Sequence, residues 1–206
     1  MVKNEKNKNK SFWEWRCFYK QEKIENKIIK NINFNLPSSS IKNYIDQYII
    51  LPNSSHNIKL RKTNNEKIRK LQIKTIIAKE KNIYKFSKKA TISLPITQKS
   101  LIKLNLLENK EDISYLIKHI NLEDNKKHVK EIKKEITRYK VSKNISNLNQ
   151  KVRLEFAKVK INTVLANTFS IKCSSIETIK EILQSLNMHD LKGTNYIDYI
   201  KSLGKF

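Results

Sequence analysis

The sequence predicts an α+β fold in which antiparallel strands dominate and a few helices lie at the periphery. Most segments alternate apolar and polar residues, as half-buried strands do. Short polar turns join several of these segments in succession. Apolar residues at the helical spacing of three and four are confined to the middle and the end of the chain. A chain of 206 residues with 38% hydrophobic content can bury one sizeable core, so we expect a single main domain.

The first half of the chain is predicted to form an antiparallel meander. Its first segment is aromatic and β-prone, and alternation places Glu14 and Arg16 on the same face. Pro52 and the polar residues after it predict a turn, and a second polar turn follows at 63–66. The expected strands are Phe12–Tyr19, Ile41–Leu51, Asn57–Lys62, Ile68–Ile77 and Ile83–Lys89. Successive strands joined by short turns are typical of a meander.

The second half combines helices with further strands. Helical spacing predicts Thr97–Glu108 and Asp112–Ile120 as helices, which together suggest a helical insertion at about residues 97–127. The pattern of Val129–Val141 fits both a helix and a strand, and we expect a strand in its second half. The remaining expected elements are strands Val152–Ile161 and Thr168–Ser174, a helix Ile176–Asn187 capped by Ser175, and a short helix Tyr196–Leu203.

The excess of positive charge is the strongest clue to function. Forty-three Lys and Arg against nineteen Asp and Glu leave a formal charge of +24, which favours an anionic partner such as phosphate or nucleic acid. A genome rich in A and T also enriches Lys, Asn and Ile, but that bias supplies acidic residues as well, and here they are scarce. Residues 1–10 are mostly Lys and Asn, so we predict a disordered basic arm before the domain at 11–206.

Several classes of protein are disfavoured by the composition. Gly193 and Gly204 are the only glycines, which excludes glycine-rich phosphate loops and leaves side chains to hold any phosphate. Cys17 and Cys173 form neither a disulfide framework nor a zinc-ligand set, and the four histidines lack metal-ligand spacing. No apolar run approaches the roughly 18 residues of a membrane span, and no secretory signal is present, so we expect a cytoplasmic or organelle stroma protein.

Charged residues at alternate strand positions indicate where an anion could bind. Such positions suit a small barrel with a polar lumen, although an open sheet with one solvated face gives the same periodicity. In a barrel, converging cations would replace the water shell of a polyphosphate or nucleotide-like anion. The candidates for the lumen are Arg16, Lys59, Arg61, Lys74, Arg138 and Arg153, with Glu14 and Glu155.

Several short motifs follow one another along the chain: FWEWR at 12–16, YIDQY at 44–48, IKLR at 58–61, LQIK at 71–74, VRLE at 152–155, TFSI at 168–171 and NYIDYI at 195–200. Their order resembles the CYTH superfamily of adenylate cyclases and thiamine triphosphatases. The resemblance implies an eight-stranded antiparallel barrel, the triphosphate tunnel, in which basic residues grip a triphosphate and acidic residues hold Mg²⁺ or Mn²⁺. It implies phosphate-side roles for Arg16, Lys59, Arg61, Lys74 and Arg153, and metal-side roles for Glu14 and Glu155.

The chain also departs from the family pattern. Phe12 stands in place of the first glutamate of the opening motif, Arg16 in place of its lysine, and 171–173 lacks the late acidic residues. Because two-metal chemistry needs several carboxylates, we expect a divergent member that binds a phosphorylated ligand, and weak metal-dependent triphosphate hydrolysis stays open. One alternative is a non-enzymatic RNA-binding protein in which Trp13, Trp15, Phe18 and Tyr19 stack on bases if they are exposed, although an aromatic stripe of this kind more often belongs to the core. Another is a scaffold for a protein contact.

Overall fold

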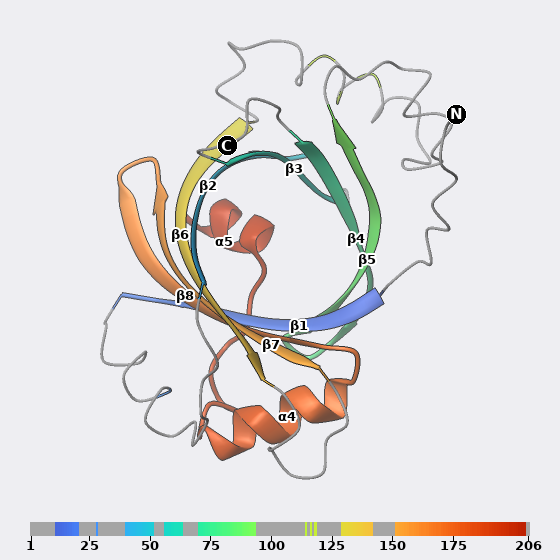
Figure 1. Cartoon of the computed structure of the whole chain (residues 1–206), viewed down its shortest axis with the longest axis vertical. Coiled ribbons are helices and arrows are strands. Elements are labelled where there is room, and N and C mark those ends of the chain that lie inside the picture. Colours follow the sequence, from blue (N-terminus) through green and yellow to red (C-terminus); the bar gives the residue numbers. More distant parts are fainter. Residues whose placement is uncertain are drawn as a thin grey trace.

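Eight antiparallel strands close into a single barrel (Figure 1). This computed structural model describes residues 11–20, 28, 40–51, 56–63, 70–93, 114, 116, 118, 129–141 and 151–204. The strands are β1 Ser11–Tyr19, β2 Ser40–Ile49, β3 His56–Thr63, β4 Lys70–Glu80, β5 Ile83–Ser93, β6 Val129–Val141, β7 Val152–Ile161 and β8 Val164–Cys173. Their order around the ring is β1-β5-β4-β3-β2-β6-β7-β8, and β8 returns to β1. The closed ring confirms the predicted barrel and shows that the open sheet is wrong.

The predicted meander is present, with differences at the ends of its strands. Strands β2 to β5 pair in succession, whereas β1 pairs with β5 and β8 and thereby closes the ring. Strand β8 starts four residues earlier than expected, because the turn at 162–163 joins it directly to β7. Asn162 has φ 53° in this turn, a left-handed conformation that asparagine tolerates better than most residues.

Strand β6 is longer than predicted, because it includes the first half of Val129–Val141 as well as the second. The spacing of Ile132 and Ile136 fits a helix, but the whole of Val129–Val141 is a strand that pairs with β2 and β7. Both isoleucines and the lysine between them, Lys134, are buried, so all three alternate positions face the barrel interior. Because a lysine stands between the two isoleucines, the hydrophobic pattern alone did not indicate the period of two that is typical of a strand.

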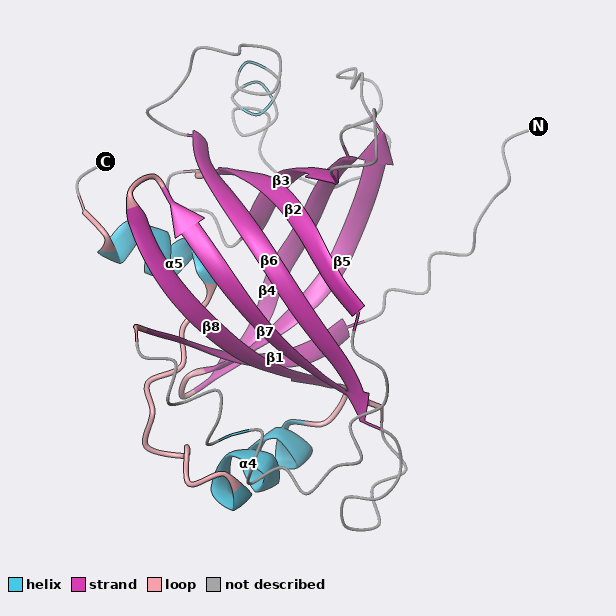
Figure 2. Ribbon diagram, turned by 60° about the vertical axis from the view of Figure 1, so that its left-hand side comes forward, coloured by secondary structure: helices cyan, strands magenta, loops and turns pink. Residues whose placement is uncertain are grey.

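Helix α4, Ile176–Ser185, covers part of the outside of the barrel (Figure 2). It begins at Ser175, whose side chain accepts a hydrogen bond from the backbone N–H of Thr178, as the predicted cap requires. Its buried Ile179 belongs to one core cluster with Trp15 of β1 and Phe169 of β8. The outward face of β1, β7 and β8 is therefore apolar, which leaves the inward face for polar residues.

Helix α5, Tyr196–Ser202, closes one end of the barrel. Figure 1, which looks along the barrel, shows α5 inside the outline of the ring. Its buried Tyr196, Ile197 and Ile200 share a core cluster with Tyr48 of β2 and Ile132 of β6. The opposite end is where β1 and β7 begin and β6 and β8 end. The lumen is therefore closed at its α5 end, where Tyr196 forms its floor.

Other predictions fall outside the described part of the chain. These are the basic arm at 1–10 and nearly all of the helical insertion at about 97–127, so the division into domains stays a prediction. Residues 114, 116 and 118 are helical, and the Leu116 side chain is fully buried. Among the described residues, no helix is both long and apolar enough to cross a membrane.

Candidate anion-binding lumen

A cavity of about 200 Å³ lies inside the barrel next to α5. Cationic side chains dominate its wall and far outnumber the carboxylates. The cations are Arg16, Lys59, Arg61, Lys74, Lys134, Arg138, Arg153 and Lys172, and the carboxylates are Glu14 and Glu155. Asp46 lies behind this wall, fully buried and paired with three of the cations. Eight cations thus face three carboxylates, an excess of five positive charges when every lysine is protonated.

The barrel brings all eight residues predicted from the sequence into this one cavity. Alternation accounts for the arrangement, because residues two apart on a strand point to the same side, as Glu14 and Arg16 do on β1. Arg153 differs from the others, since it is exposed while it still lines the cavity. Binding of phosphate or metal by these residues stays a prediction.

Four further residues that take part in the charge clusters of the lumen were not predicted. Asp46 and Lys172 occupy inward positions of β2 and β8, so the alternation of those strands could have indicated them. Lys134 was hidden by the helix-like spacing of β6. Tyr196 belongs to the motif at 195–200, but no local pattern assigned it to the lumen, because it reaches the cavity from a helix remote in sequence from the strands that it contacts.

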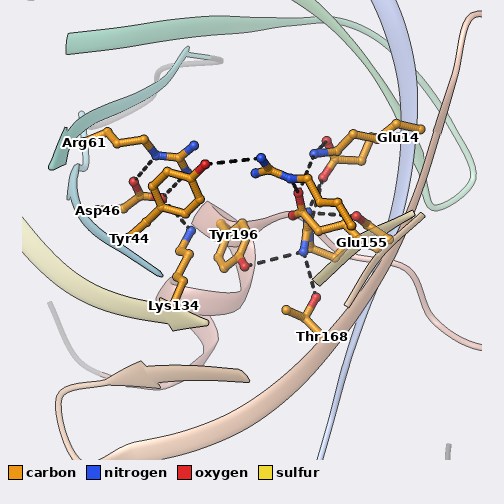
Figure 3. A network of polar contacts seen from close by, with 12 residues as sticks. Glu14, Tyr44, Asp46, Arg61, Lys134, Glu155, Thr168 and Tyr196 are labelled. Atoms are coloured by element: carbon orange, nitrogen blue, oxygen red, sulfur yellow. Dashed lines mark hydrogen bonds and ion pairs between the residues drawn. The ribbon is translucent and has the colours of Figure 1, made fainter. Parts of the chain in front are cut away.

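Asp46 is the centre of the first charge cluster (Figure 3). It accepts from Arg61 Nε and Nη2 at 2.7 Å each, from Lys59 Nζ at 3.0 Å, and pairs with Lys134 Nζ at 2.9 Å. Burial alone would raise the pKa of Asp46, but Lys134, Lys59 and Arg61 outweigh burial and hold that pKa well below its ordinary value. Burial lowers the pKa of Lys59 well below its ordinary value and that of Lys134 to about 8.

Arg16 is the centre of the second cluster. Its guanidinium donates to Glu14 Oε1 and Glu155 Oε1, both at 3.0 Å, and to the hydroxyls of Thr168 at 2.9 Å and Ser170 at 3.0 Å. Burial would lower the pKa of Arg16, but its anionic surroundings raise the pKa above the ordinary value. The side chain is 2% exposed and carries a permanent charge in the lumen.

Two more cations complete the second cluster. Lys172 Nζ lies 3.3 Å from Glu14 Oε2 and 3.9 Å from Glu155 Oε2, and Arg138 Nε donates to Glu155 Oε2 at 2.8 Å. Burial would raise the pKa of Glu14, but Lys172 and Arg16 lower it to about 2. Both glutamates are therefore ionised at neutral pH, and each of their four oxygens has a cationic partner.

Tyrosine side chains connect the two clusters. Arg138 Nη1 donates to the Tyr44 hydroxyl at 3.3 Å, and the Arg61 guanidinium lies 4.0 Å from the Tyr44 ring centroid. On the floor, Lys134 Nζ lies 3.5 Å from the Tyr196 ring centroid and the Arg16 guanidinium 4.6 Å from it. Figure 3 shows both tyrosines between the clusters. These cation–π contacts hold the cations in place while leaving their charge available.

Lys74 differs from the other buried lysines of the lumen. It makes no ion pair with any described residue, and its ammonium lies 5.1 Å from the Phe12 ring centroid and 5.8 Å from that of Phe86. Burial, together with the nearby Lys172 charge, lowers the pKa of Lys74 to about 7. An anion entering the lumen would meet a lysine that has no ion-pair partner among the described residues, and it would favour the charged form of that lysine.

The carboxylates do not fit the Mg²⁺ or Mn²⁺ site that the resemblance implies. Glu14 and Glu155 flank the Arg16 guanidinium, which occupies the space between them. Within the described ranges, no three His, Cys, Asp or Glu side chains converge as metal ligands. A divalent cation prefers several oxygen ligands that lack a fixed positive charge between them.

The aromatic residues proposed for base stacking do not form an exposed platform. Trp15 is 2% exposed and packs edge-on against Phe169 in the core beneath α4. Phe18 stacks on Tyr199 of α5, with ring centroids 3.7 Å apart. Trp13 and Tyr19 are partly buried against the same core as Trp15. Trp15 and Phe18 therefore pack into the core, as an aromatic stripe of this kind does more often, and they are not open to nucleic-acid bases.

Comparison with known proteins supports the fold. No protein-family model matches the sequence, and no curated protein matches it. A solved structure of the Pyrococcus horikoshii protein PH1012 is similar with a TM-score of 0.54 and 17% identity, covering 91% of this chain and 98% of that one. HpAC1 from Hippeastrum, an adenylyl cyclase candidate described as having a dominant triphosphatase activity, is similar with a TM-score of 0.54 and 8% identity, covering 95% and 97%. A conserved hypothetical protein of Pyrococcus furiosus matches with a TM-score of 0.50 and 17% identity, covering 90% and 98%.

Proposed function

We propose that this chain, which has the triphosphate tunnel fold, binds a short phosphate chain inside its lumen. The observation that carries the proposal is that eight Lys and Arg side chains and only three carboxylates surround the cavity inside the barrel, with Lys74 in no ion pair among the described residues. Guanidinium and ammonium groups that converge from several strands replace the water shell of phosphate oxygens.

The size of the cavity favours a phosphate chain over a whole nucleotide. A volume of about 200 Å³ is smaller than the roughly 300–1,000 Å³ of pockets that enclose a drug-sized ligand. Inorganic tripolyphosphate, or the triphosphate of a nucleotide whose base and sugar stay outside, suits this space. Arg153, Arg138 and Lys172 are the most exposed cations of the lumen, so they would meet the ligand first.

The cations are positioned before the ligand arrives. Arg16, Arg61 and Lys134 are held by carboxylates, hydroxyls and aromatic rings, so little side-chain entropy is lost when an anion binds. The same pairing occupies the carboxylates that a hydrolytic reaction would use to hold a metal. We therefore propose binding, and we assign no hydrolytic step.

Isothermal titration calorimetry with tripolyphosphate at low salt tests this proposal. We expect saturable binding of one tripolyphosphate per chain, weakened about tenfold or more by Lys74→Met, because one charge-assisted contact contributes about 1.5–3 kcal/mol. Lys180→Met is the matched control, because Lys180 lies on the exposed face of α4 and pairs with Glu80. Absence of binding, or equal losses in the two variants, would overturn the proposal.

A competition experiment between an oligonucleotide and tripolyphosphate distinguishes RNA binding, the alternative function, from binding in the lumen. If the lumen binds the phosphate chain, an oligonucleotide without a 5′-triphosphate will not displace tripolyphosphate. If instead an outer surface binds RNA, oligonucleotide binding will fall steeply with salt and Lys74→Met will not change it.

A further inference from the structure

We propose that Arg16 is a built-in cation that takes the place of a divalent metal, so that the lumen binds its phosphate chain free of metal. This inference rests on the proposed function, because it specifies the form of the anion that the lumen accepts. It predicts that Mg²⁺ weakens binding, in contrast to a site that needs the metal as a bridge.

The position of the guanidinium is the first argument. Arg16 Nη2 lies 3.0 Å from Glu14 Oε1 and 3.0 Å from Glu155 Oε1, so the guanidinium bridges two carboxylates from β1 and β7. A metal held by these two carboxylates would need the same space. Because the guanidinium is a fork of several donors, it satisfies both carboxylates at once.

The anchoring of Arg16 is the second argument. Two hydroxyls of β8, on Thr168 and Ser170, accept from the guanidinium, and both residues are fully buried. The Tyr196 ring lies against the guanidinium on the floor side. Swinging Arg16 away to admit a metal would break these contacts and leave buried polar groups unsatisfied, which is costly.

The surrounding charge is the third argument. The second oxygens of the two glutamates face Lys172 and Arg138, at 3.3 Å from Glu14 and 2.8 Å from Glu155. A divalent cation beside these carboxylates would lie close to three positive side chains in a buried site, where repulsion is weakly screened. Each oxygen of the two carboxylates therefore already has a cationic partner.

Mg²⁺ in solution binds tripolyphosphate and lowers its negative charge, so it competes with the lumen for the free anion. The lumen, with eight Lys and Arg side chains against three carboxylates, gains most from the fully charged, metal-free form.

The first experiment uses the unmodified protein and tripolyphosphate. Calorimetric titrations are run in EDTA and again with excess Mg²⁺. We expect binding in EDTA and a higher Kd with Mg²⁺. Binding that needs Mg²⁺, or that Mg²⁺ tightens by roughly tenfold, would overturn the inference while leaving the proposed function intact.

The second experiment uses Mn²⁺ alone, followed by electron paramagnetic resonance, so that it does not depend on ligand binding. We expect the unmodified protein to leave Mn²⁺ free. Arg16→Ala removes the cation between the Glu14 and Glu155 carboxylates, so this variant should bind Mn²⁺ and its Tm should rise with Mn²⁺. Arg16→Lys keeps a charge between the carboxylates and should leave Mn²⁺ free, as should the surface control Lys180→Ala.

The two experiments separate the possible failures. Binding of Mn²⁺ by the unmodified protein at these carboxylates, abolished by Glu14→Gln, would overturn the role of Arg16 whatever the result with tripolyphosphate. Absence of tripolyphosphate binding in both EDTA and Mg²⁺ would overturn the proposed function instead. If Arg16→Ala does not fold, the tripolyphosphate titrations of the unmodified protein in EDTA and in Mg²⁺ still decide the question.

Discussion

Asp46 lies opposite Arg61 in the register of β2 and β3, and its carboxylate accepts both hydrogen bonds of the Arg61 fork at 2.7 Å. The carboxylate is fully buried and also pairs with Lys59 and Lys134. One fully buried anion therefore stabilises three cations of the cavity wall. Asp46 is therefore the residue that balances the charges of Lys59, Arg61 and Lys134.

The substitution Asp46→Asn should destabilise the protein strongly. Removing one partner of a buried ion pair leaves uncompensated charge and costs about 3–5 kcal/mol. Urea denaturation followed by circular dichroism measures this loss. Asp190→Asn is the control, because the Asp190 side chain is 92% exposed and should change stability by less than about 0.5 kcal/mol. Equal stability of the two variants would contradict the role of Asp46.

The same substitution should strengthen anion binding. Asp46→Asn leaves Lys59, Arg61 and Lys134 without their carboxylate, so a phosphate chain becomes the remaining anion for them. We expect tripolyphosphate to raise the Tm of the variant more than that of the unmodified protein, since a ligand that binds the folded state stabilises it. A smaller rise in the variant would place the ligand away from this cluster.

Binding of tripolyphosphate should take up protons near pH 8. The pKa of Lys74 is about 7 and that of Lys134 about 8 in the free protein, so both lysines are partly neutral at this pH. An anion raises these pKa values by favouring the charged form, so affinity should fall as pH rises from about 6 to 9. Titrations in two buffers with different ionisation enthalpies count the protons. Lys74→Met should reduce the uptake, whereas a flat pH profile would show that Lys74 does not meet the ligand.

The free protein should become more stable as pH rises above 7. The pKa values of Lys74 and Lys134 are about 7 and 8 in the folded state, against an ordinary lysine pKa of 10.5. Between about pH 7 and 10.5 the unfolded chain therefore binds more protons than the folded protein. Stability therefore increases with pH across this window. Above pH 10 the trend reverses, because burial raises the pKa of Tyr84 to about 12 and the folded state keeps a proton that the unfolded chain loses.

Thermal unfolding at a series of pH values measures this dependence. The Tm should rise between about pH 7 and pH 9 at constant salt, and Lys74→Met should flatten the rise. On the acid side, Glu14 has a pKa of about 2 against an ordinary 4.5, so stability should fall as pH drops below 4.5. A Tm that falls steadily from pH 7 to 9 would contradict the buried state of these lysines.

Alternation within strands was enough to predict several residues of the lumen that share a strand. Glu14 with Arg16, and Lys59 with Arg61, follow directly from the period of two. Closure of the barrel did not follow from that period, because an open sheet has the same alternation and only the pairing of β1 with both β5 and β8 distinguishes the two.

Contacts between remote segments could not be predicted in the same way. Tyr196 reaches Arg16 across 180 positions of sequence, and no local pattern indicates that a terminal helix closes the barrel. Asp46 was visible as a charged residue in a strand, but its three partners come from β3 and β6, whose register depends on the folded ring.

The attachment of α5 to the barrel depends on Gly193. A Cβ atom at this position would lie 2.5 Å from the Asn82 carbonyl oxygen and 2.5 Å from Trp15 Nε1. The next residue, Thr194, donates its backbone N–H to the Arg16 carbonyl oxygen at 2.7 Å, which fixes the segment that leads into α5. No larger residue fits here without moving the backbone or a buried tryptophan.

Gly193→Ala should therefore loosen α5 as well as destabilise the protein. Overpacking of this kind costs about 1–3 kcal/mol, and hydrogen–deuterium exchange should increase in α5 before it increases in the strands. Because Tyr196 forms the floor of the lumen and contacts Arg16 and Lys134, tripolyphosphate binding should weaken too. Lys192→Ala is the control, since Lys192 is exposed and adjacent. Loss of stability with unchanged binding would mean that the floor contributes nothing to the site, and that the strands alone hold the anion.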